Sequence, residues 1–175
     1  MIQMIDNFLS KTYHKELLNI LDSAFFPWFY NQNITVDKKQ KSSVYSHGFS
    51  HIFYDYSNGG FRDTMYTNLI RPMLYQIMDT VKANSLLRAR ADMTMSTPNN
   101  YEHSVHTDYD FKNISTIYYL NKSDGDTIFF DKKIKPFKKI SPKPNRLVFF
   151  NGDISHTGCS PKNFKNRILI NSNYD

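Results

Sequence analysis

From Leu86 to the end, the chain is a series of short apolar segments separated by turn sequences, and this pattern constrains the fold more than any other feature. The separators include KSDGD at 122–126 and SPKPN at 141–145, both made of residues that favour turns. Eight short strands at this spacing predict a double-sheet jelly roll. The predicted strands are 86–97, 102–108, 114–121, 126–131, 133–140, 146–152, 154–159 and 167–173.

The first 85 residues show helical periodicity instead. Apolar residues at helical spacing predict one amphipathic helix that begins after an N-cap at Ser10, and a second helical region over Phe61–Val81. Pro72 lies in the second region, so we expect a kink or two helices that meet there. Because the helices precede the strands, we predict a single α+β domain over 1–175. Its 1–85 part provides helices and loops that pack on one sheet of the 86–175 jelly-roll core.

Two segments of the first half have alternative interpretations. The aromatic segment Phe25–Tyr30 (FFPWFY) is expected to pack between helix and sheet, with contact to a substrate as the alternative. The polar segment Thr35–Phe49 is expected to be a loop, and it can be either a lid over a site or a plain surface loop. A strand over Ser50–Tyr56 follows it.

Composition says more about the cellular location of the protein than about its function. The chain has a formal charge of +6 and a pI near 9.3, which permits an acidic partner without requiring one. Cys159 is the only cysteine, which excludes an internal disulfide framework. The sequence has neither a signal-peptide pattern nor an apolar run of the roughly 20 residues that a bilayer span needs. These features predict a cytoplasmic protein with no membrane partner.

Three residues of the strand-rich half have the side chains of a metal site. His106 and Asp108 are two residues apart, so in an extended strand both point to the same face. His156 lies on a later predicted strand and offers a third ligand. Two histidines and one carboxylate suit non-haem Fe(II), although the same set can bind another metal. His103, three residues before His106, is expected on the opposite face, at the surface or behind the ligands.

Arg167 and Tyr119 are candidates for binding an anion inside the barrel. Arg167 lies in the largely apolar segment RILIN, where an unpaired guanidinium would be costly to bury. It can bind a carboxylate ligand, or it can form an internal salt bridge with Asp153 or Asp126. Tyr119 points to the same strand face as Ile117, so its hydroxyl is a second candidate donor. The lysine run at 132–143 is typical of a charged edge strand, which we favour over a nucleic-acid surface.

The set HTD…H…R, with TIYYLN after the first pair and NRLVFF before the second histidine, resembles the Fe(II)/2-oxoglutarate-dependent oxygenases. It is most similar to their prolyl-hydroxylase-like branch, including small bacteriophage members. The resemblance implies a double-stranded β-helix in which His106, Asp108 and His156 bind Fe(II). It also implies that Arg167 and Tyr119 bind the distal carboxylate of 2-oxoglutarate, with Thr127 and Asn171 in the same pocket.

What the resemblance implies for the reaction is hydroxylation of a substrate, with O2 consumed, succinate and CO2 released, and ascorbate as a further reductant. A prolyl, other peptidyl or amino-acid side chain is the expected target, and a peptide or small molecule is favoured over nucleic acid. Ser96-Thr97 stands where prolyl hydroxylases often have a tyrosine, so proline specificity does not follow. The alternatives are a cupin-like metal enzyme without redox chemistry and a binding module of the same fold.

Overall fold

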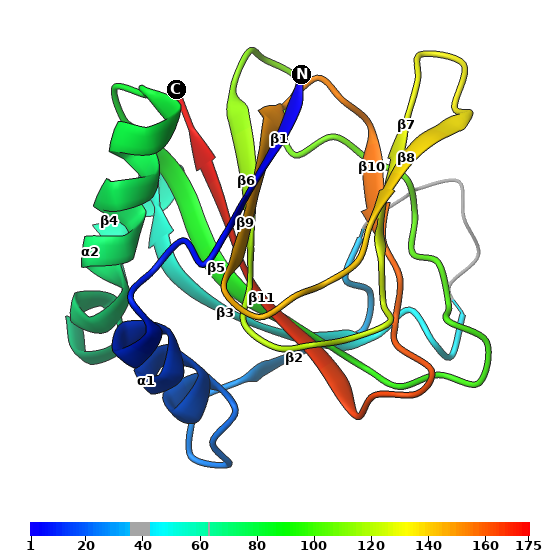
Figure 1. Cartoon of the computed structure of the whole chain (residues 1–175), viewed down its shortest axis with the longest axis horizontal. Coiled ribbons are helices and arrows are strands. Elements are labelled where there is room, and N and C mark those ends of the chain that lie inside the picture. The colour runs from blue at the N-terminus through cyan, green and yellow to red at the C-terminus, as the bar shows by residue number, and fades with distance from the viewer. Residues whose placement is uncertain (36–42, 63) are drawn as a thin grey trace.

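The computed structural model describes residues 1–35, 43–62 and 64–175 (Figure 1). It contains two α-helices, α1 (Lys11–Leu21) and α2 (Thr64–Val81), and the short 3₁₀ helix η1 (Tyr56–Asn58). The strands of the first half are β1 (Ile2–Asp6), β2 (Phe29–Asn31), β3 (Gly48–Asp55) and β4 (Gly60–Phe61). Those of the second half are β5 (Leu86–Met95), β6 (Ile114–Tyr119), β7 (Thr127–Phe130), β8 (Pro136–Ile140), β9 (Arg146–Asn151), β10 (His156–Gly158) and β11 (Asn166–Tyr174).

The strands form two antiparallel sheets that face each other, as the predicted jelly roll requires. The larger sheet has the order β1-β9-β6-β11-β5-β3-β2, with β4 paired to β3, and the smaller sheet has the order β10-β7-β8. Both helices lie on the outer face of the larger sheet (Figure 1). The α+β class and the packing of the N-terminal helices on one sheet are therefore confirmed. The first 85 residues also contribute β1, β2, β3 and β4 to that sheet, which the sequence pattern showed only in part.

One predicted strand is wrong. Residues 102–108 form no continuous strand, and only isolated bridges from Glu102 to Cys159 and from His106 to His156 connect this segment to its neighbours. The residues of this segment are mostly polar, and apolar and polar side chains do not alternate along it. Among the described residues, the two bridges alone pair its backbone with another segment. The metal-ligand candidates therefore do not owe their placement to the alternation of a regular strand.

Two hydrophobic cores flank the larger sheet. The outer core joins both helices to the sheet and contains Leu17, Ile77 and Tyr118. The inner core lies between the two sheets and contains Tyr119 and Phe129. Neighbouring residues of β6 thus enter different cores, as the alternation of side chains along a strand requires.

The helices begin and continue for identifiable reasons. The hydroxyl of Ser10 accepts a hydrogen bond from the backbone N–H of Tyr13, which confirms the predicted N-cap of α1. The expectation of two helices at Pro72 is wrong, because α2 is one helix of 18 residues that includes this proline. Proline costs the helix one hydrogen bond. Side chains fully buried against the sheet on both sides of it, Ile70 and Leu74 among them, hold the helix together.

The structure decides only in part between the alternative interpretations of residues 25–30 and 35–49. Phe26 is buried and packs against Trp28 and Tyr66, whereas Phe25 is 92% exposed, so only part of the aromatic segment is core. The predicted loop ends earlier than expected, since β3 begins at Gly48. Residues 36–42 of that loop lie outside the described residues.

The lysine run contains β8, which is the edge strand of the smaller sheet, as predicted. Lys139 of this strand forms an ion pair of 3.0 Å with Asp126. No helix among the described residues is long and apolar enough to span a bilayer.

Candidate metal and anion site

His106, Asp108 and His156 lie together between the two sheets. One potential ligand atom from each residue lies within 4.8 Å of the other two. The backbones of the two histidines form a bridge, in which each N–H donates to the carbonyl of the other at 3.0 and 2.9 Å. This bridge brings together two residues that lie 50 positions apart, and it places their imidazole rings with centroids 4.7 Å apart.

Hydrogen bonds to the backbone orient both imidazole rings. Nδ1 of His106 lies 3.0 Å from the carbonyl oxygen of Ser104, and Nδ1 of His156 lies 3.2 Å from that of Ile154. Because a carbonyl oxygen can only accept a hydrogen bond, Nδ1 carries the proton in each ring. The lone pair of each Nε2 is then available to a metal ion. Burial, followed by the nearby His106, lowers the pKa of His156 to about 4, so His156 is neutral at pH 7, as a metal ligand must be.

Asp108 is held by donors on both of its oxygens. Arg88 donates to Oδ1 at 2.8 Å, and the Ser115 hydroxyl and the Asn173 amide each donate to Oδ2 at 2.9 Å. Oδ2 also lies 4.0 Å from Nε2 of His156. Burial alone would raise the pKa of Asp108, but His156, Arg88 and Asn173 together hold it well below the ordinary range. The carboxylate is therefore charged at neutral pH and fixed in one orientation.

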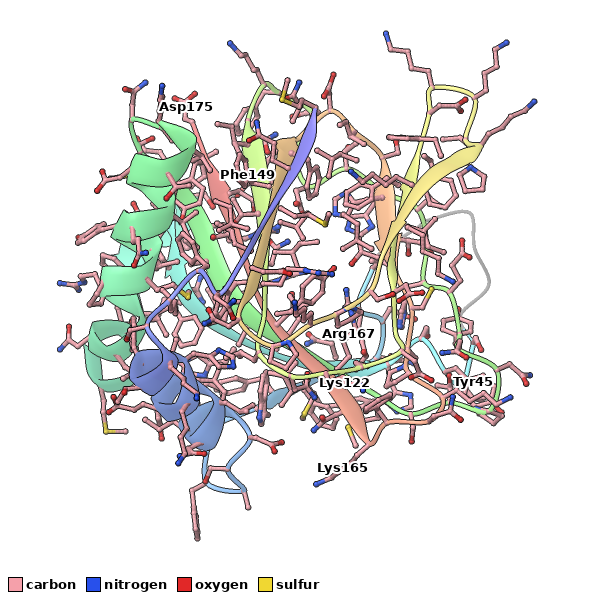
Figure 2. The ribbon with its side chains drawn as sticks, in the orientation of Figure 1. Tyr45, Lys122, Phe149, Lys165, Arg167 and Asp175 are labelled. Atoms are coloured by element: carbon pink, nitrogen blue, oxygen red, sulfur yellow. The ribbon has the colours of Figure 1, made fainter. Side chains whose placement is uncertain are left out.

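Arg167 projects from β11 into the space between the sheets (Figure 2). It is 6% exposed and makes no ion pair with any described residue, so the alternative of an internal salt bridge with Asp126 or Asp153 is wrong. Its Nη2 donates to the Thr127 hydroxyl at 2.8 Å, and that hydroxyl lies 2.6 Å from the hydroxyl of Tyr119. Burying a guanidinium without a carboxylate partner costs free energy, and an anionic ligand bound to it would offset that cost.

Several polar atoms around Arg167 also lack partners. The buried atoms without a hydrogen bond include Nε of Arg167, the hydroxyl of Thr94 and Nδ1 of His103. All three residues line the cavity that is also lined by His106, His156, Thr127 and Asn171. A dicarboxylic acid with one end near the histidines and the other at Arg167 would satisfy such donors. The donors and ligands of the site therefore suit the chemistry of a divalent metal and a dicarboxylic acid.

β5 provides a polar wall that the sequence interpretation missed. Arg88, Arg90, Asp92 and Thr94 share the inner face of β5, while Ala89 and Ala91 enter the outer core. The signal was present in LLRARADMTM, where charged or polar residues alternate with small apolar ones. For His103, the expected surface position is wrong, because the residue is 4% exposed and lines the cavity beside the ligand histidines. Cys159 is buried, and burial raises the pKa of its thiol to about 11, which agrees with a passive role.

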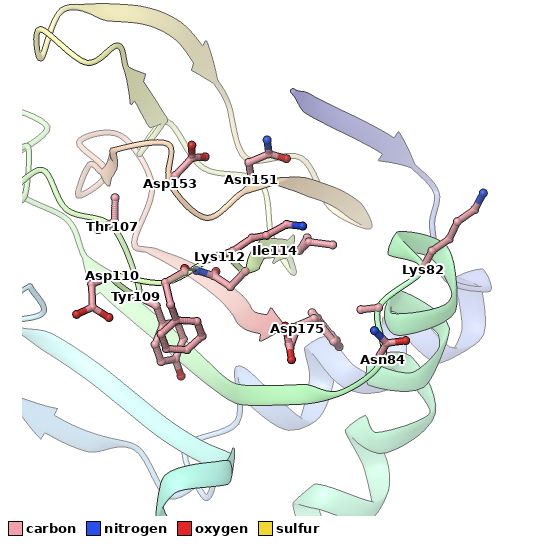
Figure 3. Close-up of a pocket in the computed structure, with 14 residues that line it drawn as sticks. Lys82, Asn84, Thr107, Tyr109, Asp110, Lys112, Ile114, Asn151, Asp153 and Asp175 are labelled. Atoms are coloured by element: carbon pink, nitrogen blue, oxygen red, sulfur yellow. Dashed lines mark hydrogen bonds between the residues drawn. The ribbon is translucent and has the colours of Figure 1, made fainter.

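A separate surface cavity of about 850 Å³ borders the metal-ligand loop. Thr107 and Tyr109, the residues on either side of Asp108, line one part of it. Figure 3 shows its labelled side chains spread from Thr107 to Lys82, which follows the end of α2. The cavity is wide enough for a side chain of a peptide or for a small molecule.

Residues 93–175 match the family described as the 2OG-Fe(II) oxygenase superfamily. Among solved structures, the chain is similar to an oxidoreductase of that family from Burkholderia pseudomallei, with a TM-score of 0.74 and 11% identity over 99% of this chain and 84% of that one. A prolyl hydroxylase from Trichoplax adhaerens, in complex with a hypoxia inducible factor peptide fragment, gives 0.69 and 16% over 99% and 82%.

The viral collagen prolyl hydroxylase of Paramecium Bursaria Chlorella virus-1 gives a TM-score of 0.59 and 15% identity over 99% of this chain and 94% of that one. At identities this low, these structural likenesses establish the fold alone. A sequence comparison with curated proteins found no match.

Proposed function

We propose that this chain, whose residues 93–175 match the 2OG-Fe(II) oxygenase superfamily, hydroxylates a substrate at the site formed by His106, Asp108 and His156. The chain is a 2-oxoglutarate-dependent dioxygenase, and its family uses Fe(II), 2-oxoglutarate and O2. The observation that carries the assignment of residues is that both histidines of this ligand set line one cavity together with Arg167, a buried arginine that has no ion pair with the described residues.

The three ligands would hold iron through Nε2 of each histidine and Oδ2 of Asp108. Bound iron supplies the activation of O2, in which the 2-oxo acid is oxidised to succinate and CO2 while the substrate gains a hydroxyl group. The role of Arg88 is to occupy Oδ1 of Asp108, so that the carboxylate presents one oxygen to the metal. Two histidines and one carboxylate oxygen would leave open positions on a bound metal, as such ligand sets do.

Arg167 would bind the distal carboxylate of 2-oxoglutarate. Its Nη2 and the hydroxyls of Thr127 and Tyr119 already form one connected group, so few side chains need to move. The guanidinium fork suits a carboxylate held by two hydrogen bonds. Leu169 enters the inner core beside Tyr119 and excludes water from that end of the cavity. Asn171, which accepts a hydrogen bond from Arg88 at 3.3 Å, would connect the co-substrate pocket to the metal ligands.

The primary substrate would reach the iron on the side of the cavity where Arg90 and Asp92 are partly exposed beside the two ligand histidines. We propose a peptidyl or amino-acid side chain, or a small molecule, as this substrate, because the HTD…H…R set resembles the prolyl-hydroxylase-like branch.

The test separates metal binding from co-substrate binding. Protein mixed anaerobically with Fe(II) and 2-oxoglutarate should develop the weak visible charge-transfer band of the chelate. His106→Ala should abolish iron binding, and Arg167→Ala should weaken 2-oxoglutarate binding while iron still binds. Loss of a hydrogen-bonded charged partner predicts a decrease of roughly 10- to 100-fold.

The matched control is Arg62→Ala, an exposed arginine whose ion pair among the described residues is a 3.8 Å contact with Asp55. This variant should bind iron and 2-oxoglutarate as the unchanged protein does. Co-substrate affinity that is the same in the Arg167 and Arg62 variants would show that the co-substrate assignment is wrong.

A further inference from the structure

Arg90 is a second arginine in the cavity, and the co-substrate does not account for it. It lies on the inner face of β5 and lines the cavity together with His106, His156 and Arg167. Its strand position is opposite Asn171 of β11, whereas Arg167 is opposite Thr94, four residues further along β5. The two side chains therefore project from different levels of the barrel, and Arg167, not Arg90, is the one bonded to Thr127.

In the ion pair between Arg90 and Asp92, both side chains keep polar atoms that can still bind a ligand. Nε of Arg90 lies 2.9 Å from Oδ2 of Asp92, and no other hydrogen bond or ion pair joins either side chain to the described residues. The two terminal nitrogens of Arg90 and Oδ1 of Asp92 are therefore available. Their side chains are 23% and 12% exposed, so solvent or a ligand can reach them. A purely structural pair of this kind would commonly be closed by two parallel hydrogen bonds.

The charges of the loaded site do not balance without another anion. Three arginines and a divalent metal face two aspartates and the dianion of 2-oxoglutarate, with the ligand histidines neutral. One positive charge remains, in a region where charges are partly removed from water. Arg88 is paired with Asp108 through Nη2, Arg90 with Asp92 through Nε alone, and Arg167 would take the free carboxylate of the co-substrate. Of the three, Arg90 is the one whose two terminal nitrogens bond no described residue, so it is where a further anion can bind. A buried positive charge is stabilised by an anionic partner.

We propose that Arg90 binds a carboxylate of the primary substrate, so that this enzyme acts on a free amino or organic acid, or on an acidic side chain. This inference rests on the proposed function and narrows its substrate class. A prolyl ring in a peptide carries no charge and would leave the terminal nitrogens of Arg90 without partners. The same wall that would receive such a ring carries an ion pair here, which disfavours an apolar target.

The experiment measures succinate release from the iron-loaded protein with three groups of compounds. The first group is free L-amino acids and small dicarboxylic acids, and the second is peptides with internal aspartate or glutamate and capped ends. The third group lacks carboxylates and contains N-acetyl amino-acid amides and a capped prolyl peptide. Stimulation by either of the first two groups, with none by the third, supports the proposal and identifies the source of the carboxylate. Stimulation by the third group alone, or by none of the three, overturns it.

A second measurement uses Arg90→Ala with the best compound of the first two groups. The apparent affinity for that compound should fall roughly 10- to 100-fold, since a charge-assisted hydrogen bond is lost. Arg90→Lys should recover part of it, because the charge is kept without the fork. The charge-transfer band of Fe(II) and 2-oxoglutarate should be unchanged in both variants. Loss of that band in Arg90→Ala would overturn the proposal, since Arg90 would then serve the co-substrate, whereas the proposed function would stand.

Discussion

The contact between Arg88 and Asp108 allows a quantitative prediction about the protein without its metal. The substitution is Arg88→Met, which keeps an unbranched apolar stem and removes the guanidinium. The bond of 2.8 Å joins a side chain that is 20% exposed to a carboxylate that is 3% exposed. Removing one partner of a buried ion pair costs about 3–5 kcal/mol, because the other charge is left uncompensated.

The lower end of that range applies here. Ser115 and Asn173 still donate to Oδ2 of Asp108 after the substitution, so the carboxylate keeps part of its stabilisation. We therefore expect Arg88→Met to lower the free energy of unfolding by about 3 kcal/mol. For a chain of this length, that corresponds to a decrease in melting temperature of roughly 6–12 °C.

The assay is urea unfolding of the metal-free protein, repeated with saturating Mn²⁺ in place of the oxidisable iron. A divalent ion bound at Oδ2 compensates the charge that Arg88 no longer neutralises. Metal should therefore stabilise the variant more than it stabilises the unchanged protein, and the difference between them should shrink. The combination with Asp108→Asn should cost less than the sum of the single changes, because neither charge is then left alone.

Two results would refute this reasoning. Additive costs in the double variant would mean that the two side chains do not interact energetically. An equal stabilisation of both proteins by Mn²⁺ would mean that the metal does not sense the charge on Asp108.

Two further predictions test other parts of the molecule. Gly158→Ala should reduce 2-oxoglutarate affinity with little loss of stability. The added Cβ would lie 3.0 Å from Nη1 of Arg167 and displace the guanidinium. Titration of the charge-transfer band measures the affinity, and an unchanged value would contradict this prediction. Asp6→Asn should destabilise the protein by about 0.5–1 kcal/mol at pH 7. The hydrogen bond from Arg146, and then that from Lys143, hold the pKa of Asp6 well below its ordinary value of 3.8, so its contribution exists above that pH and is lost as the pH falls below it. Urea midpoints of the two proteins should therefore differ at pH 7 and converge as the pH is lowered below 3, and a constant difference would show that this ion pair is not the cause.

Comparison of particular elements shows why some predictions succeeded. The alternation in ISTIYYL predicted that Tyr118 and Tyr119 face opposite sides of β6, and they enter different cores. This worked because a strand turns successive side chains by half a revolution, whatever surrounds it. The predicted strand over 102–108 is wrong, because pairing between distant segments, rather than local propensity, decides whether a polar stretch forms a strand.

By itself, the sequence determined the sheet-rich second half, the two helices of the first half and the residue types that a metal and a dicarboxylic acid require. These depend on local periodicity and on side-chain chemistry. Only the tertiary structure decided which groups meet. These contacts are the bridge between His106 and His156, the ion pair between Arg88 and Asp108, and the position of Arg90 in the cavity. Such contacts depend on the register between strands far apart in the chain, and a shift of one residue would turn each side chain to the other face of the sheet.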